Sequence, residues 1–324
     1  MNDMFTINES FEKNGTMMRE TYCDTLLALA VDNENIVVLD SDLVSSSGMK
    51  PFFQRFPDRA FNCGIAEANM IGIAAGLSVM GKIPFAHSFG CFATRRVCDQ
   101  IMISAAYAKQ NVRIIGSDPG VTAAYNGGTH MPFEDMGVLR SIPEITLIEP
   151  CDNVILEDIV RQLADLKGVY YIRMARKNAY SVYKDGSKFH IGRGNTLVDG
   201  TDVTVFASGI MVHEALKAAS ILHVEGVSAR VVDMFTWKPI DTELVDNCAR
   251  ITGAFVTAEN HNIVGGLGSA IAEVAAKVRP VPIEMVGVKD RFGQVGTEDF
   301  LREEYELTAP EIVAAAKRAI ARKA

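Results

Sequence analysis

From Arg19 onward, short β-rich runs alternate with longer helical stretches, and this alternation leaves few folds open. The β-rich runs are continuous and apolar, which is typical of strands buried on both faces of a sheet. Such strands, separated by helices, predict a parallel sheet covered by helices on both sides. In the first half of the chain the predicted strands are Ile36–Leu39, Val112–Gly116, Thr146–Glu149 and Val169–Arg173, and the predicted helices include Glu67–Met80, Arg95–Lys109 and Asn153–Leu166.

A change of composition over Lys184–Thr201 divides the chain, because Gly, Asp and Lys become frequent and helical periodicity is lost. We therefore predict two α/β domains, over residues 16–185 and 201–324, of which the second is smaller. Residues 1–15 are an N-terminal extension and residues 186–200 a linker. In the second domain the predicted strands are Val203–Ala207, Ala229–Asp233 and Ala254–Ala258, and the predicted helices are Val212–His223, Gly268–Val278 and Ala309–Lys323.

Composition excludes some classes of function. The 324-residue chain has a net charge of -8, whereas a nucleic-acid-binding protein would present a basic surface. Its six cysteines are scattered, without a CxxC pair, which indicates free thiols in a reducing cytoplasm. The N-terminus lacks the apolar core of a signal peptide, and no apolar run is long enough for a membrane span. We expect a soluble, cytoplasmic protein with no nucleic-acid or membrane partner.

The predicted helix that begins at Glu67 carries the first chemical signal. Its other residues are almost all Gly, Ala, Ile, Leu and Met, so the opening carboxylate should be partly buried. Burial disfavours the charged form of a carboxyl group, so Glu67 could exchange a proton with a ring nitrogen. It could equally do no more than complement the helix dipole. Phe89 and Phe92, which follow the next predicted strand, are either core residues or a flat surface for a heterocycle.

The run GIAEANMIGIAAGL, followed by a strand and an FxxF pair, resembles the pyrimidine-binding domain of the transketolase family. That resemblance implies thiamine diphosphate as cofactor, with Glu67 hydrogen-bonded to N1' of its aminopyrimidine ring and Phe89 and Phe92 stacked on that ring. Arg95 stands where some members place a further aromatic residue of the same pocket. Later runs, including VTAENHNIVGGLGSAIAEV, resemble the C-terminal domain of the family, so the likeness covers almost the whole chain after residue 15.

The family signature for the diphosphate and Mg2+, GDG followed by Asn-Asn, does not occur in this sequence. The Asp-Gly pairs at residues 185–186 and 199–200 are loop signals near the domain boundary. A diphosphate needs a metal ion and backbone donors, and we expect no metal ligands in this chain. The resemblance therefore implies a split enzyme in which a partner subunit holds Mg2+ and the diphosphate, with two copies of each chain.

The resemblance also implies a phosphorylated sugar substrate. Arg19 and Arg176 fall where the family places its phosphate-binding arginines, and Ser46 falls where it places a helping hydroxyl. Guanidinium groups suit this task because they bind phosphate through paired hydrogen bonds, although each arginine taken alone could be a solvated surface residue. The implied reaction moves a two-carbon ketol unit from a ketose phosphate to an aldose or its phosphate.

Four further residues are candidates for contact with the substrate. His130 follows two glycines in a predicted loop, and the resemblance makes it the catalytic histidine. Asp118 and Asn126 stand where members usually have a histidine and an aspartate, so we expect an unusual pair of substrates. Asp118 could instead pair with a basic group of the partner. His261, at the start of the GGLG turn, is either a substrate-binding or a structural residue, with structure favoured.

Three other functions are compatible with parts of this pattern. The β subunit of a 2-oxo acid dehydrogenase shares both domains, but it usually has serine where this chain has Met131, and it has no use for phosphate-binding arginines. Half of a deoxyxylulose phosphate synthase-like enzyme is another alternative. A non-catalytic scaffold derived from the family would not need Glu67 at the mouth of an apolar helix.

Overall fold

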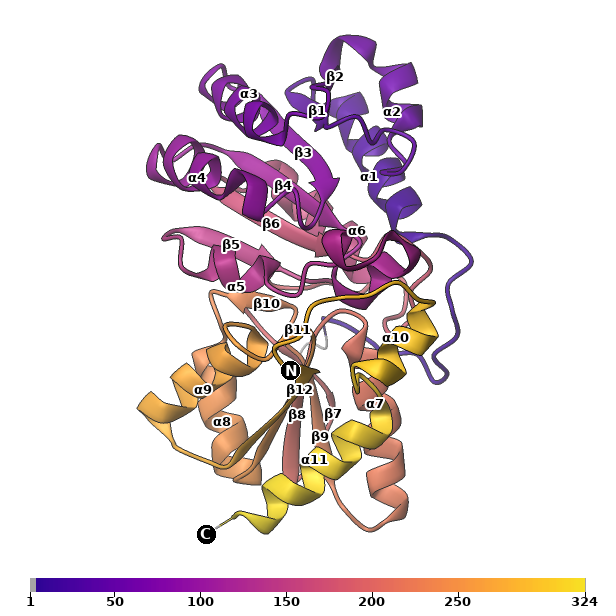
Figure 1. Ribbon diagram of the computed structural model, residues 1–324, viewed down its shortest axis with the longest axis vertical. Coiled ribbons are helices and arrows are strands. Elements are labelled where there is room, and N and C mark those ends of the chain that lie inside the picture. The colour runs from indigo at the N-terminus through magenta and orange to yellow at the C-terminus, as the bar shows by residue number, and fades with distance from the viewer. Residues whose placement is uncertain (1–3, 324) are drawn as a thin grey trace.

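A seven-stranded sheet forms the centre of the first domain in the computed structural model, which describes residues 4–323 (Figure 1). Its strand order is β10-β5-β6-β4-β3-β1-β2, and every pairing is parallel except that of β10 with β5. The strands are β1 (Ile36–Asp40), β2 (Ala60–Asn62), β3 (Ile83–Phe89), β4 (Val112–Ser117), β5 (Ile145–Ile148), β6 (Val169–Met174) and β10 (Thr236–Lys238).

Helices cover both faces of this sheet, as the continuous apolar strands predicted. One face carries α1 (Met18–Asp32), α2 (Lys50–Arg55) and α6 (Asn153–Asp165), and α1 packs directly on α6. The other face carries α3 (Glu67–Val79), α5 (Asp135–Arg140) and the helical stretch of α4 (Cys98–Gln100) and η3 (Ile101–Tyr107). Short helical turns lie at η1 (Pro57–Arg59), η2 (Arg95–Val97), η4 (Gly120–Asn126) and η5 (Gly128–His130).

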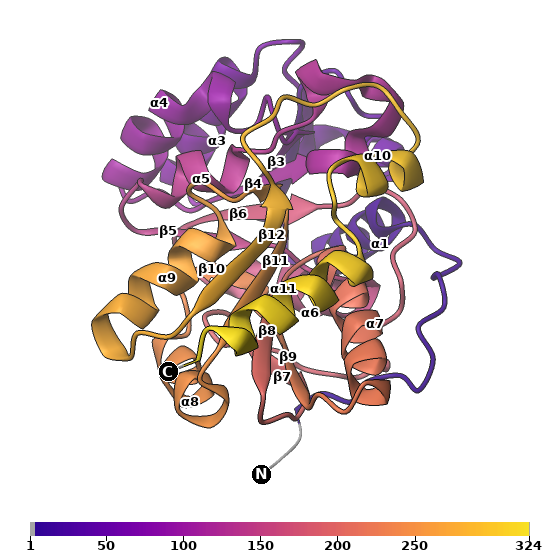
Figure 2. The ribbon, with the colours of Figure 1, turned by 60° about the horizontal axis from the view of Figure 1, so that its bottom comes forward.

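The second domain is built on a five-stranded sheet of order β12-β11-β8-β9-β7, in which only β7 is antiparallel to its neighbour (Figure 2). Its strands are β7 (Asn195–Val198), β8 (Val203–Ala207), β9 (Ala229–Asp233), β11 (Phe255–Asn262) and β12 (Ile283–Val288). Its helices are α7 (Met211–Val224), α8 (Thr242–Thr252), α9 (Leu267–Val278), α10 (Glu298–Glu304) and α11 (Ala309–Ala321). Residues of α7 and α11 belong to one apolar core and residues of α8 and α9 to the other.

The two domains share structure across the predicted boundary. Strand β10 lies in the second domain by sequence but pairs with β5 of the first sheet. At the other end of the chain, Ile7 and Lys13 form isolated antiparallel bridges with Tyr183 and Tyr180, next to the predicted linker. Asp152 joins these parts, because one carboxylate oxygen caps α6 while the other accepts hydrogen bonds from the backbone of residues 182 and 183.

The predicted architecture of two α/β domains with a parallel sheet is confirmed, and two predicted strands, Val203–Ala207 and Ala229–Asp233, have the predicted bounds. The single helix predicted over Arg95–Lys109 is wrong in detail. A tight turn over Arg95–Val97 precedes α4, and the last part widens to a π-helix over Ile101–Tyr107. Apolar spacing does not distinguish such a stretch from a regular helix, because π and α turns bury nearly the same residues.

Candidate functional site

The predicted site residues gather where strands of the first sheet end. Phe89 closes β3, Asp118 directly follows β4, and Arg176 follows β6 by two residues. Ser46 lies in the loop after β1. The carboxyl ends of parallel strands meet at one edge of a sheet, which is the usual place of a ligand site in an α/β fold. The topology therefore brings together residues that are far apart in the sequence.

Glu67 is the first residue of α3, and only 2% of its side chain is exposed. Its Oε2 accepts a 2.8 Å hydrogen bond from Nη1 of Arg96. Its Oε1 lies 3.5 Å from the hydroxyl of Ser88, which in turn accepts a 2.8 Å hydrogen bond from Ser41. The carboxylate is thus buried at a helix N-terminus, where the dipole favours negative charge, and one oxygen faces a partly exposed guanidinium.

Three aromatic rings lie beside this carboxylate. The ring centroids of Phe89 and Phe92 are 6.4 Å apart, and the His130 ring packs edge-on against both, at 6.0 Å and 5.1 Å. Nδ1 of His130 is 2.9 Å from the hydroxyl of Thr129. Phe89, Phe92 and His130 are each partly exposed, so the group has a face open to a ligand. The structure therefore brings the predicted ring pocket and the predicted catalytic histidine together.

Arg96, which the sequence did not single out, links these elements. Its guanidinium lies 4.0 Å from the centroid of the Phe92 ring while it pairs with Glu67. Arg95 instead pairs with Glu134 at 2.7 Å. A planar cation therefore stacks on Phe92 and donates a hydrogen bond to Glu67, which are the two interactions that a flat aminopyrimidine ring would require. On this observation, Glu67 and Phe92 fit the pyrimidine half of thiamine diphosphate.

The two predicted anion-binding arginines lie next to each other. Arg19 and Arg176 each donate a hydrogen bond from Nη1 to the backbone carbonyl of Ser46, at 3.2 Å and 3.4 Å. Ser46 therefore contacts the arginines through its carbonyl, whereas the sequence predicted a role for its hydroxyl. Arg176 also lies over Phe89, with 5.5 Å between the guanidinium carbon and the ring centroid. The arginine pair and the ring pocket are thus neighbours.

Asp118 binds one of these arginines directly. Its Oδ1 accepts a 3.1 Å hydrogen bond from Nε of Arg176, and its Oδ2 lies 2.9 Å from Nη2. Burial raises the pKa of Asp118, and the guanidinium of Arg176 opposes that rise. Asn126 lies at the exposed end of η4, separated from Asp118 by a backbone with a positive φ at Ala124. The structure brings Asp118 to the arginine pair, whereas the Asn126 side chain has no hydrogen-bond partner within residues 4–323.

His261 lies apart from these residues. Its side chain is fully buried, Nε2 accepts a 3.2 Å hydrogen bond from the backbone of Gly137, and Nδ1 lies 2.6 Å from the carbonyl of Asn262. Its ring packs edge-on against Trp237 at 5.4 Å. Burial lowers the pKa of His261 to about 4, so the ring is neutral. These contacts tie α5 to β11 and give His261 a structural role, and its contact with a substrate stays a prediction.

His87 is a buried residue of the site region for which the sequence suggested no role. Neither of its ring nitrogens has a hydrogen-bond partner among the described residues, and the same is true of the hydroxyl of Tyr22, whose ring packs edge-on against it. Burial, with a smaller effect of the Arg176 charge, lowers the pKa of His87 to about 3. His87 therefore adds a neutral ring, and no charge, beside the arginine pair.

Behind the site lies a buried ionic network that the sequence did not predict. Arg173 donates to Asp135 at 2.9 Å and to Glu149 at 2.5 Å, and it also donates to the carbonyl of Asn260 at 2.8 Å. Burial alone would lower the pKa of Arg173, but the two carboxylates raise this pKa above its ordinary value. Glu149 also accepts from Ser208 of the second domain. The network therefore fixes the end of β6, two residues before Arg176, against the second domain.

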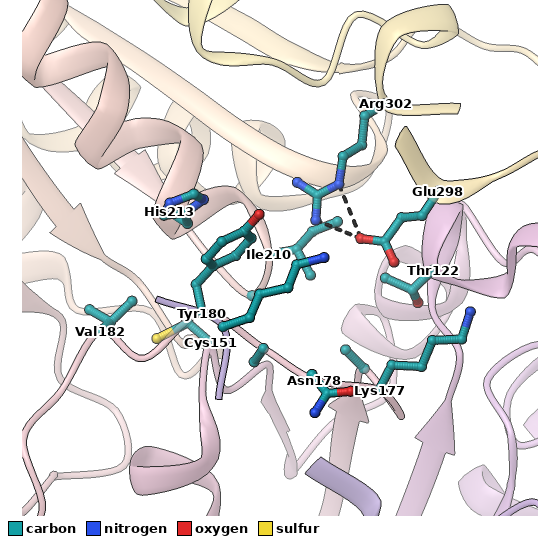
Figure 3. A pocket seen from close by; sticks show the side chains of 14 residues that line it. Thr122, Cys151, Lys177, Asn178, Tyr180, Val182, Ile210, His213, Glu298 and Arg302 are labelled. Carbon is teal, nitrogen blue, oxygen red and sulfur yellow. Dashed lines mark hydrogen bonds and ion pairs between the residues drawn. The ribbon is translucent and has the colours of Figure 1, made fainter. Parts of the chain in front are cut away.

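A separate pocket opens between the two domains (Figure 3). Arg302 and Glu298 of α10 form one wall as an ion pair, and Tyr180 stacks on His213 with ring centroids 3.7 Å apart. Thr122 and Lys177 line it from the loops that carry Asp118 and Arg176. None of the predicted site residues lines this pocket, so the candidate site is the arginine and aromatic group at the sheet edge.

Two kinds of feature are absent from residues 4–323. No group of three or more His, Cys, Asp and Glu side chains in this range is arranged to hold a metal ion. None of its helices is both long and apolar enough to cross a membrane.

Comparison with known proteins assigns the family. Residues 14–181 match the transketolase pyrimidine-binding domain and residues 192–312 match the transketolase C-terminal domain. The chain therefore belongs to the transketolase family, as its motifs predicted. It is 50% identical over 306 residues to the 6-deoxy-6-sulfo-D-fructose transketolase subunit of Clostridium sp. (strain MSTE9), covering 94% of this chain and 95% of that one.

Two other relatives are also parts of split enzymes. An apulose-4-phosphate transketolase subunit of Phocaeicola vulgatus is 37% identical over 273 residues, covering 84% of this chain and 87% of that one. A solved split-gene transketolase, described as an inactive β4 tetramer, superimposes with a TM-score of 0.90 at 44% identity, covering 96% of this chain and all of that one. The protein is thus a transketolase-type subunit, a transferase of a thiamine diphosphate-dependent family.

Proposed function

We propose that this chain joins a diphosphate-binding partner to form a transketolase that moves a two-carbon ketol unit between sugars with an anionic end. The observation that supports this proposal is that Glu67, Phe92 and His130 lie beside the arginine pair of Arg19 and Arg176. One relative acts, by its name, on a sulfonated ketose and another on a phosphorylated one. An arginine pair suits either kind of sugar, because guanidinium groups bind oxyanions through charge-assisted hydrogen bonds.

Within this proposal each residue has a chemical task. Thiamine diphosphate, when bound, supplies the carbon nucleophile that attacks a ketose carbonyl. Glu67 would hold N1' of the aminopyrimidine ring and serve as its proton-exchange partner, and Phe89 and Phe92 would pack against that ring. His130, edge-on to both phenylalanines, exchanges protons with the substrate oxygens. Arg19 and Arg176 bind the anionic end of the sugar, so that its reacting carbon is oriented toward the cofactor pocket.

The proposal assigns the diphosphate and Mg2+ to a second polypeptide, because the sequence lacks the GDG and Asn-Asn signature. Two copies of each chain would give a heterotetramer. The apolar surface of α3 and η3 supports such a partner, since these helices pack together and expose large apolar side chains. The exposed ones at or next to these helices are Ile65, Val79, Met80, Met102, Ile103 and Tyr107.

Reconstitution with the partner tests this function. The tagged chain is purified from its native cells, the stoichiometric partner is identified by mass, and the complex is assayed for ketol transfer with thiamine diphosphate and Mg2+. Glu67→Gln should lower turnover by orders of magnitude while folding and pairing persist, because the variant cannot exchange the proton. Glu157→Gln, on the exposed face of α6, is the matched control. Full turnover in Glu67→Gln, or the absence of any partner, would contradict the proposal.

A further inference from the structure

The arginine pair is asymmetric, because only one of its members is neutralised. Asp118 contacts Arg176 through both carboxylate oxygens and is itself 1% exposed. Within residues 4–323 no carboxylate lies within ion-pair distance of Arg19, whose recorded contact is with the carbonyl of Ser46. Two guanidinium groups and one carboxylate leave a net positive charge, to which nearby Lys177 adds, so Asp118 offsets only part of the positive field that the end of a sugar meets.

The Asp118 carboxylate is held in place rather than free to turn away. Asp118 has a φ of +54°, a region in which Asp and Asn are tolerated far better than most residues. The preceding residue, Ser117, is the last of β4, which lies between β3 and β6. Since the backbone is anchored on the sheet and the side chain is paired with Arg176, the negative charge is a fixed feature of the site.

A fixed negative charge matters most for ligands that carry more than one charge. A phosphate monoester carries about -1.5 to -2 at pH 7 because its second pKa is close to 6. A sulfonate is a strong acid with one ionisable group, so it carries a single charge at any physiological pH. Both groups present three oxygens to the same donors, and the Asp118 carboxylate therefore discriminates between them chiefly by charge.

We propose that Asp118 lowers the preference of this anion site for a dianionic over a monoanionic sugar end, so that sulfonated ketoses are accepted as well as phosphorylated ones. This inference rests on the proposed ketol transfer and concerns its substrate. Asp118 acts through Arg176 and through its field, so it is a positioning residue. An extra charge about 6 Å from Asp118 at an effective dielectric of about 20 changes binding by about 100-fold, and solvent screening reduces this to about 10- to 100-fold.

The test compares two donors that differ only at C6, 6-deoxy-6-sulfo-D-fructose and D-fructose 6-phosphate. The reconstituted complex is assayed with each donor and with glycolaldehyde as acceptor, because a neutral acceptor makes no demand on the arginine pair. The ratio of kcat/KM for the sulfonate to kcat/KM for the phosphate should be about 10- to 100-fold higher in the wild-type complex than in a complex that lacks the Asp118 charge. The difference should lie mainly in KM, since the anionic end is bound alike before and during the reaction.

Asp118→Asn is the decisive variant, because asparagine keeps the shape and tolerates the positive φ while it removes the charge. It should raise kcat/KM for the phosphate donor relative to the sulfonate donor by about 10- to 100-fold. Asp290→Asn is the matched control, since Asp290 also has a positive φ (+49°) but lies on the exposed surface. The control variant should keep the wild-type ratio.

The outcomes separate this inference from the function on which it rests. An unchanged donor ratio in a folded Asp118→Asn complex would overturn the role of Asp118 while leaving ketol transfer intact. Failure of both donors, together with no effect of Glu67→Gln, would overturn the proposed function itself. If Asp118→Asn does not fold, Asp118→Gly decides the matter by the same ratio, because glycine removes the same charge and tolerates the positive φ.

Discussion

Replacement of Arg173 by methionine should destabilise the chain more than the loss of any other single buried arginine. The guanidinium is fully buried and donates to two carboxylates, Asp135 and Glu149, which are themselves at most 3% exposed. Methionine has a comparable length and apolar character, so the change removes the charge without opening a large cavity. What remains is a pair of buried carboxylates near each other with no cation between them.

The magnitude follows from what the two carboxylates lose. Breaking a buried ion pair by removing one partner typically costs about 3–5 kcal/mol, because the other charge stays buried without compensation. Tyr171 and Ser208 still donate to Asp135 and Glu149, so part of the hydrogen bonding survives. The carbonyl of Asn260 also loses a donor, which adds about 1 kcal/mol. We expect a loss of about 4 kcal/mol in the free energy of unfolding.

Arg113→Met provides the control. Arg113 is equally buried, but it donates to the backbone carbonyls of Asn111, Leu163 and Leu166 and is not paired with a carboxylate. Its loss should cost about 1–3 kcal/mol, the penalty of unpaired backbone acceptors. Urea denaturation of both variants at one protein concentration measures the difference, since self-association would change the apparent stability. If Arg173→Met costs no more than Arg113→Met, the ionic network does not hold the two domains together.

Two further predictions concern the anion site and the pH dependence of stability. Arg19→Met should raise KM for an anionic ketose by about 10- to 100-fold with little change in kcat. The control Arg161→Met, on the exposed face of α6, should change neither KM nor kcat. Steady-state kinetics of the reconstituted complex measures both variants. Burial raises the pKa of Asp233 from 3.8 to about 7, so between these values the folded chain holds a proton that the unfolded chain has released, and stability falls as pH rises. Asp233→Asn should therefore stabilise the chain progressively from about pH 4 to about pH 7 in thermal denaturation, and a pH-independent effect would refute this assignment.

Much of the fold could be predicted because short apolar runs in the sequence indicate the strands. Val203–Ala207 is buried at every position, and a continuous apolar run bounded by turn residues indicates a central strand without any tertiary information. Strand β10 could not be predicted, since three residues give no periodicity and its pairing with β5 exists only after the two domains meet. The end of β11 was missed for a related reason: Glu259–His261 are polar, yet they are buried at the domain interface.

Candidate site residues could be predicted where a charged residue stands out in an apolar stretch of the sequence. A carboxylate that opens an almost wholly apolar helix is conspicuous, and Glu67 is indeed buried there. Arg96 was missed because it adjoins another arginine, and only the tight turn over Arg95–Val97 determines which side chain faces Glu67. The contact of Ser46 through its carbonyl was equally hidden, since backbone groups leave no trace in a sequence.

The second domain supplies few candidate residues, yet it holds the loop that follows Asp118. Asn260 of β11 is fully buried, and its amide accepts from the backbone of Val121 and donates to the carbonyl of Pro119, each at 2.9 Å. Gly120 lies between these contacts with a φ of +51°, and a Cβ there would approach Oδ1 of Asn260 to 2.1 Å. Only glycine fits, so the loop directly after Asp118 has one conformation against β11. The position of the Asp118 charge is thus fixed by the second domain as much as by β4, which explains why a domain without reacting groups belongs to the catalytic unit.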